Sequence, residues 1–315
     1  MTAIQSGTPP VPTVEPAEAP AAAPRSYRIG YGHWWWALPA LVLMITIIYV
    51  TTVAGGFYAF TDWTGIGPFN FVGFKNFTMI FQTPELIGGL VNTLLLAVGF
   101  LVLTNVFGLL FALALNRTLK TRYVLRTLIF MPVVLSPIAV SYVWKFIFAI
   151  DGPLNQFLGS VGLTSWQQDW LASPKLALLC ILTVMVWQNI GFVMVTYLAG
   201  LATVPPELEE AAAIDGASTW RRFRNITLPM IQPSLAINTT LTLIQGLRVF
   251  DQVLALTGGG PAGATETLAT QIYKQTFVYN AFGSGAAMAL LLFVLILIFT
   301  VVQQQLTRDR SGIGG

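Results

Sequence analysis

Charge is the scarcest feature of this 315-residue sequence. Asp, Glu, Lys and Arg together make up 9% of the residues, whereas soluble domains carry about 25%. So few charged groups cannot cover a water-facing surface, and 55% of the residues are hydrophobic. The apolar residues also come in runs of the roughly 20 positions that a helix needs to cross a bilayer. The composition therefore excludes an ordinary soluble protein and predicts an integral membrane protein.

Cysteine and histidine are nearly absent as well. Cys180 is the only cysteine and His33 the only histidine, which excludes an internal disulfide and a Cys/His metal cluster. A lone cysteine within an apolar run is typical of a small packing residue. We find no nucleophile or acid–base pair of the kind that an enzyme needs, and expect no metal. The net charge of +3 gives no indication of nucleic-acid binding.

The N-terminal segment differs from the rest in composition. It is rich in Pro and Ala and lacks aromatic residues up to residue 24, so it cannot bury enough apolar surface to offset chain entropy. We predict a disordered cytoplasmic tail over residues 1–33, a transmembrane domain over residues 34–307 and a short cytoplasmic tail over residues 308–315. The tail lacks the charged start and short apolar core of a signal peptide.

Six apolar windows are long enough to span a membrane as helices, because unpaired backbone groups are costly in lipid. They cover residues 36–59, 88–115, 127–149, 176–200, 234–256 and 282–302. The predicted fold class is an all-α membrane protein with six transmembrane helices.

Basic residues predict the orientation of these helices. Eleven of the sixteen Lys and Arg residues fall on one side: two before span one, four between spans two and three, three between spans four and five, and two after span six. The opposite loops contain only Lys75, Lys175 and Lys274. The positive-inside rule then places both termini and the second and fourth loops in the cytoplasm.

The loop over residues 203–229 carries strong local signals. Thr203 can cap a helix, Pro205 and Pro206 suit a first turn, and three glutamates favour the positive end of the helix dipole. Gly216 can end this helix, Ser218 can cap a second one, and Pro229 would stop it. Two short helices joined at a glycine can relay force to the spans that flank them. An amphipathic loop lying on the lipid surface is the alternative.

The same loop resembles a known family. Glu210-Ala211-Ala212, Gly216, Ile226 and Leu228-Pro229 match, with every spacing, the EAA motif of the membrane subunits of bacterial ABC importers. The resemblance implies the type I importer fold and a loop that docks on a cytoplasmic ATPase. The implied coupling residues are Glu210, Ala211, Ala212, Asp215, Gly216 and Pro229.

ATP hydrolysis is not expected in this chain itself. The sequence has no G-x-x-x-x-G-K-[ST] loop. The stretch Gly258–Pro261 lacks the lysine of a phosphate cradle and is interpreted as an outer turn. No cofactor is therefore expected in this chain, and the resemblance implies that a partner ATPase binds ATP and Mg²⁺.

Two further segments resemble the sugar branch of this family, in particular the larger membrane subunit of maltose and glycerol-3-phosphate importers. They are Val249-Phe250-Asp251-Gln252, continuing through Gly258-Gly259-Gly260-Pro261, and the outer stretch over residues 71–77. The resemblance implies uptake of a di- or oligosaccharide, with glycerol-3-phosphate as the alternative. It also implies the partners: a second permease subunit, two ATPase copies and an extracytoplasmic sugar-binding protein, a lipoprotein by our expectation. The location is the bacterial cytoplasmic membrane.

Polar residues in spans four and five are candidates for the substrate site. Span five carries Asn238, Thr242, Gln245, Arg248 and Gln252 at steps of three and four, which predicts one polar stripe on a helix. Span four adds Trp187, Gln188 and Asn189. The stripe either lines a cavity for a polyhydroxyl ligand or holds helices together. In the resembling importers, the positions of Asn189, Gln245 and Arg248 lie near the cavity. The predicted lining residues are Gln188, Asn189, Gln245, Arg248 and Asp251.

Two interpretations of Arg248 remain open. Arg248 and Asp251 lie three residues apart and can form an ion pair, or Arg248 can meet an anionic substrate.

Rival functions remain open as well. A secondary carrier usually needs ionisable relays in the membrane, for which Asp251 is the only candidate carboxylate. A membrane enzyme or an insertase are further alternatives.

Overall fold

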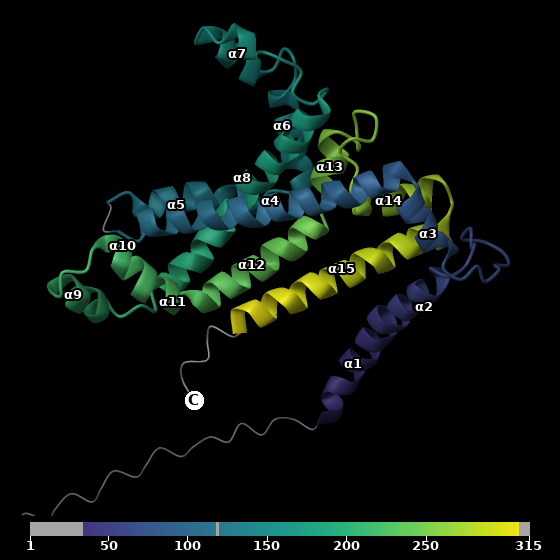
Figure 1. Ribbon diagram of the computed structural model, residues 1–315, viewed down its shortest axis with the longest axis horizontal. Helices are drawn as coiled ribbons and strands as arrows, with labels where there is room; N and C mark the ends of the chain where they lie inside the picture. Colours follow the sequence, from purple (N-terminus) through teal and green to yellow (C-terminus); the bar gives the residue numbers. More distant parts are fainter. Residues whose placement is uncertain (1–33, 118–119, 309–315) are drawn as a thin grey trace, which may run out of the picture. The chain divides into compact units, whose positions relative to one another are not determined.

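The computed structural model describes residues 34–117 and 120–308. Within these residues the regular secondary structure is helical, and the loops contain one isolated β-bridge between Thr61 and Phe71. The predicted tail over residues 1–33 lies outside the described residues, as do residues 309–315. The helices are α1 Leu38–Met44, α2 Thr51–Tyr58, α3 Lys75–Gln82, α4 Pro84–Leu115, α5 Arg122–Phe130, α6 Pro137–Ile147, α7 Pro153–Ser160, α8 Pro174–Leu201, α9 Pro206–Ile214, α10 Thr219–Arg222, α11 Leu228–Met230, α12 Gln232–Leu247, α13 Asp251–Leu256, α14 Leu268–Tyr273 and α15 Phe282–Arg308 (Figure 1).

Contacts divide the chain into two units, residues 1–49 and residues 50–315. The described part of the first unit consists of a 3-10 turn, α1 and most of a π-helical stretch. In the second unit α4 packs along α8 and α12, and α15 packs against α12, α14 and α2. Figure 1 shows α4, α12 and α15 as long neighbouring rods, with α9 and α10 at one end and α14 and α3 at the other.

Four of the six predicted spans are long apolar helices in the structure. They are Trp35–Tyr58, Pro84–Leu115, Pro174–Leu201 and Phe282–Gln305, judged by length and composition over the described residues. Leu, Val, Ile and Phe make these helices strongly apolar, as expected for helices in lipid.

The third predicted span is not one straight helix. Residues 122–134 and 137–147 form two helices that meet at an angle of 102°. Pro132 and Pro137 cause the break, because each lacks a backbone N–H and disfavours helical geometry in the residue before it. Leu135 and Ser136 are accordingly extended, with ψ of 146° and 131°.

The fifth predicted span is also interrupted. Helix α12 ends at Leu247, and α13 begins at Asp251 after a break with φ −134° and ψ −58° at Phe250. No proline marks this break. Instead Gly246 packs so closely on α4 that a Cβ there would lie 2.7 Å from the Cα of Ala97. The hydroxyl of Thr267 donates to the carbonyl of Val249 at 3.1 Å, so the loop that precedes α14 satisfies a carbonyl that the break releases.

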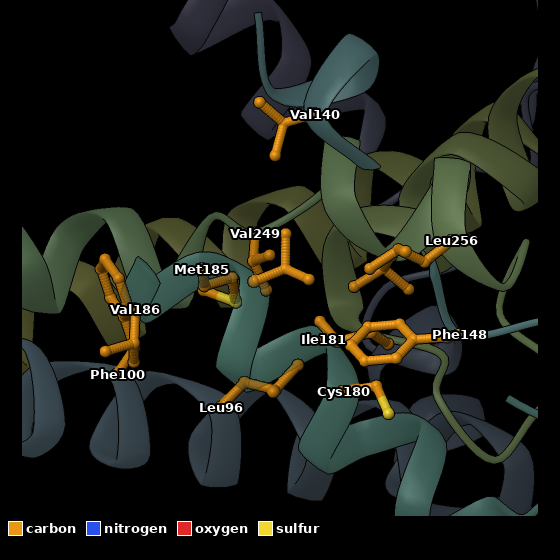
Figure 2. Close-up of a cluster of buried hydrophobic side chains, with 12 residues drawn as sticks. Leu96, Phe100, Val140, Phe148, Cys180, Ile181, Met185, Val186, Val249 and Leu256 are labelled. Atoms are coloured by element: carbon orange, nitrogen blue, oxygen red, sulfur yellow. The ribbon is translucent and has the colours of Figure 1, made fainter. Parts of the chain in front are cut away.

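A buried apolar cluster joins the two breaks. It draws side chains from α4, α6, α8, α13 and the residue Val249. Figure 2 shows the ring of Phe148 beside Ile181 and Leu256, and Met185 beside Val249. Cys180 is buried in this cluster, as predicted for a packing residue.

Candidate transport cavity and coupling loop

A cavity of about 340 Å³ opens where the broken spans three and five meet α8. All five residues predicted to line a substrate site lie on its wall: Gln188, Asn189, Gln245, Arg248 and Asp251. Gln252, Leu135 and Pro137 line it as well. The structure therefore brings together polar groups from α8, the end of α12 and the start of α13.

Gln188 connects the two broken spans. Its side chain is buried, its Nε2 donates to the carbonyl of Leu135 at 2.9 Å, and its Oε1 accepts from Gln252 Nε2 at 3.3 Å. The Leu135 carbonyl lies in the extended stretch between α5 and α6, where no helical partner is available. One amide thus satisfies the break in span three and touches the helix that follows the break in span five.

The remaining polar groups are held less tightly. Asn189 Nδ2 donates only to the carbonyl of Met185 in its own helix, at 2.9 Å. Within the described residues the side chains of Gln245 and Arg248 have no hydrogen-bond partner, and both are exposed. An amide and a guanidinium with free donors can bind hydroxyl or anionic oxygens of a ligand.

The ion pair considered between Arg248 and Asp251 is not formed. The only salt bridge among the described residues joins Lys274 to Glu266, on either side of α14. The helix break at residues 248–250 separates the two side chains, because the spacing of three brings residues together only on a continuous helix. Arg248 is therefore unpaired on the cavity wall.

The predicted polar stripe divides into two parts. Asn238 and Thr242 are buried and bond within the bundle: Asn105 Nδ2 donates to Thr242 Oγ1 at 2.9 Å, and the Tyr197 hydroxyl donates to Asn105 Oδ1 at 2.8 Å. Gln245, Arg248 and Gln252 line the cavity. The prediction of one stripe along a single helix is wrong because α12 ends at Leu247.

Trp187 does not line the cavity. Its ring packs edge-on against Trp144, with centroids 5.4 Å apart, on another side of α8. Sequence reasoning also missed the stretch Leu135–Pro137, whose carbonyl and ring form part of the wall. The signal was present, because two prolines five residues apart within an apolar run indicate a broken helix.

The loop over residues 203–229 folds into two helical segments joined at Gly216. Helix α9 ends at Ile214, and Gly216 has φ +79°, a left-handed conformation that favours glycine. The amide of Ala217 donates to the Ala212 carbonyl at 2.9 Å, which closes the helix end. Ser218 accepts from the amide of Arg221 and caps the second segment, as predicted.

Two details of this loop differ from the prediction. Thr203 does not cap α9, because its hydroxyl donates to the Gly200 carbonyl of the preceding helix at 2.8 Å. Pro229 does not stop the second segment, which continues through α11 to Met230. A π-helical turn over residues 223–227 precedes Pro229 and widens the helix, so the missing N–H is accommodated.

The predicted coupling residues form the outer face of this loop. Glu210, Ala211, Asp215, Gly216 and Pro229 are exposed, and Ala212 is half-buried. Glu209 faces inward instead, where its carboxylate accepts from the Thr227 hydroxyl at 2.8 Å. This bond ties α9 to the segment that leads into α12.

The segment between α2 and α3 is held by a short turn. The backbone amide of Asn70 donates to Asp62 Oδ1 at 2.6 Å, and the Asn70 side chain donates to Oδ2 at 3.1 Å. These two bonds hold the pKa of Asp62 below its usual value of 3.8. Asn76 donates to the carbonyls of Ala59 and Thr61, at 2.9 and 2.8 Å, and ties α3 to the end of α2.

Comparison with known proteins agrees with this architecture. Residues 104–312 match the family described as "Binding-protein-dependent transport system inner membrane component". The chain is 32% identical over 285 residues to a probable starch degradation products transport system permease protein of Thermoanaerobacterium thermosulfurigenes, covering 90% of this chain and 97% of that one. It is 35% identical over 291 residues to the trehalose/maltose transport system permease protein of Thermococcus litoralis, covering 91% and 96%.

A solved structure shares the fold. A bacterial alginate ABC transporter, in complex with an alginate pentasaccharide-bound periplasmic protein, aligns with a TM-score of 0.76 at 24% identity. The alignment covers 89% of this chain and 95% of that one. The chain belongs to the family of binding-protein-dependent transport system inner membrane components, which confirms the resemblance drawn from the EAA motif. It is a transport subunit of an ABC importer rather than a catalytic chain.

Proposed function

We propose that this chain is one of two permease subunits through which an ATP-driven importer takes up a di- or oligosaccharide by alternating access. The cavity between the two broken spans carries the proposal. It combines free amide and guanidinium donors with a wall whose shape depends on two helix breaks. Groups at such breaks can rearrange between discrete states, as alternating access requires. The names of the two relatives, which specify starch degradation products and trehalose/maltose, support a sugar.

The complete assembly follows from this function. The chain crosses the bacterial cytoplasmic membrane six times with both termini in the cytoplasm, if the bent pair α5–α6 and the interrupted pair α12–α13 each count as one span. A second permease subunit completes the pore, and two copies of an ATPase bind ATP and Mg²⁺. The face formed by Glu210, Ala211, Ala212, Asp215 and Gly216 docks on the ATPase. An extracytoplasmic binding protein delivers the sugar.

The test is ATPase activity of the reconstituted importer with its binding protein and a panel of sugars. We expect stimulation by a di- or oligosaccharide. Gln245→Leu should raise the sugar concentration needed for half-maximal transport about fivefold, the loss of one hydrogen bond of about 1 kcal/mol. Thr196→Val is the matched control, because the Thr196 hydroxyl donates to its own helix at Phe192 and does not line the cavity.

The unpaired Arg248 favours one second candidate, an anionic substrate such as glycerol-3-phosphate. Stimulation by that anion, with no response to neutral sugars, would establish it in place of the saccharide. Uptake driven by a proton gradient without ATP would refute both and favour a secondary carrier.

A further inference from the structure

A second and larger cavity lies at the other end of the bundle, beside the coupling loop. It has a volume of about 680 Å³, within the range of about 300–1,000 Å³ that is typical of ligand pockets. Its walls come from the second half of α4, the end of α8, α9, α10 and the π-helical turn that follows. It shares no lining residue with the transport cavity.

One wall is apolar and open to the surroundings. Val106, Leu109, Leu110 and Leu113 form this wall on α4, and the side chains of Val106 and Leu110 are 49% and 55% exposed. The wall extends from Val106 to Asn116, ten residues of helix, or about 15 Å at 1.5 Å per residue. That length is half of the roughly 30 Å hydrocarbon core, so the wall matches the depth of one leaflet.

The other end of the cavity is basic. Arg117, directly after α4, and Arg222, at the end of α10, both line it, and neither forms an ion pair with a described residue. Arg222 makes only a long contact of 3.4 Å to Thr219, and its Nε is buried without a partner. The single acidic lining residue, Glu209, already accepts a hydrogen bond from Thr227. Two arginines and one glutamate leave a net charge of +1.

Trp220 completes the rim. Its ring is 66% exposed and lies against Phe223, with centroids 5.7 Å apart. Exposed tryptophan beside arginine is typical of the boundary between hydrocarbon and headgroups. The cavity therefore has an apolar part at acyl-chain depth and a cationic part at headgroup depth.

We propose that this cavity binds an anionic phospholipid of the cytoplasmic leaflet, with an acyl chain along α4 and the phosphate between Arg117 and Arg222. Basic pockets between helices at the cytoplasmic side are suited to such headgroups. The inference rests on the proposed function only for the orientation that places this end at the cytoplasmic face. The residues assigned to ATPase docking, Glu210 to Gly216, do not line the cavity, so a lipid and the ATPase can bind together.

The bound lipid contacts the inner side of the coupling loop. It touches α10 and the π-helical turn, and this turn ends at Thr227, the partner of Glu209. Occupancy therefore supports the contact that ties α9 to α12, and the lipid composition of the inner leaflet sets how firmly the loop is held.

The test uses the assembled importer in nanodiscs of phosphatidylcholine, with and without phosphatidylglycerol. Lipid retained after transfer to detergent is measured by native mass spectrometry. We expect selective retention of phosphatidylglycerol by the wild type. Arg117→Gln and Arg222→Gln should each reduce it about fivefold, the factor for one basic group at an anionic surface. The double variant should reduce it about 25-fold.

Two further variants separate the contribution of the cavity arginines from that of the apolar wall. Arg221→Gln removes a neighbouring exposed arginine that does not line the cavity, and retention should stay at the wild-type level. Leu110→Trp fills the apolar wall and leaves both arginines in place, so retention should fall. Added inorganic phosphate should not displace the lipid, because it lacks the chain.

Equal retention in the wild type and the double arginine variant would overturn the proposal, as would an equal loss in Arg221→Gln. Displacement by inorganic phosphate would show that the cavity binds a free anion and not a lipid. Sugar-stimulated ATPase activity of the wild type is measured separately in the nanodiscs that contain phosphatidylglycerol. Its absence would refute the proposed transport function without deciding lipid retention.

Discussion

Replacement of Gln188 by leucine tests the connection between the two broken spans. The change removes the donor to the Leu135 carbonyl and the acceptor for Gln252, at 2.9 and 3.3 Å. A fully buried carbonyl that loses its partner costs about 1–3 kcal/mol, and because Leu135 is 49% exposed we expect about 1–2 kcal/mol. Local opening of the segment between α5 and α6 should become easier by that amount.

Hydrogen exchange of the backbone amides at residues 133–135, followed by mass spectrometry, measures this opening. A change of 1–2 kcal/mol corresponds to exchange about 5–30 times faster. The matched control is Asn189→Leu, because Asn189 bonds only within α8 and its loss leaves the segment unchanged. Exchange at the wild-type rate in the Gln188 variant would show that this amide does not hold the break, and the reasoning would be refuted.

Three further predictions concern the coupling loop and the outer segment. Thr227→Val removes the donor to Glu209 and should reduce sugar-stimulated ATPase activity about fivefold, because a part-buried hydrogen bond contributes about 1 kcal/mol. Thr203→Val is the control: the Thr203 hydroxyl bonds only to Gly200, so this variant should keep full stimulation. Glu210→Lys reverses the charge of the exposed docking face and should abolish uptake while the protein still inserts; normal uptake would remove the coupling assignment. Lys274→Met leaves the buried Glu266 without its cation. Because the Lys274 side chain is 34% exposed, the free energy of unfolding in a denaturant titration should fall by less than the roughly 3–5 kcal/mol of a fully buried pair, and a second change, Glu266→Gln, should restore most of the loss.

Much of the helical architecture could be predicted from hydropathy. Spans one, two, four and six appear as long apolar helices because length and apolar composition alone determine them. The breaks in spans three and five were missed for different reasons. The first had a local signal in Pro132 and Pro137. The second depends on close packing of Gly246 against Ala97 and on Thr267 in a distant loop, contacts that no local pattern encodes.

The five candidate lining residues could be named from the sequence, but their arrangement could not. All five predicted lining residues share one cavity, because polar side chains within apolar spans have few other places to lie. The ion pair between Arg248 and Asp251, one of two interpretations left open, required a continuous helix and does not form, and the predicted single stripe is divided for the same reason. The structure instead uses Asn238 and Thr242 to hold helices together and leaves Gln245 and Arg248 free.

Similar reasoning applies to the coupling loop. Gly216 and Ser218 were predicted correctly because a left-handed C-terminal glycine and a serine cap are local signals. Thr203 and Pro229 were not, since the hydroxyl of Thr203 bonds back to α8 and a π-helical turn accommodates Pro229.

The most direct test of the central claim is transport by the complete importer in sealed vesicles, with the binding protein on one side and ATP on the other. Labelled saccharide should accumulate only with ATP, and Gln245→Leu should shift the half-saturating concentration while Thr196→Val does not. Identical uptake in all three proteins would contradict the assignment of the cavity between the broken spans as the transport site. Accumulation without ATP would contradict an ATP-driven importer.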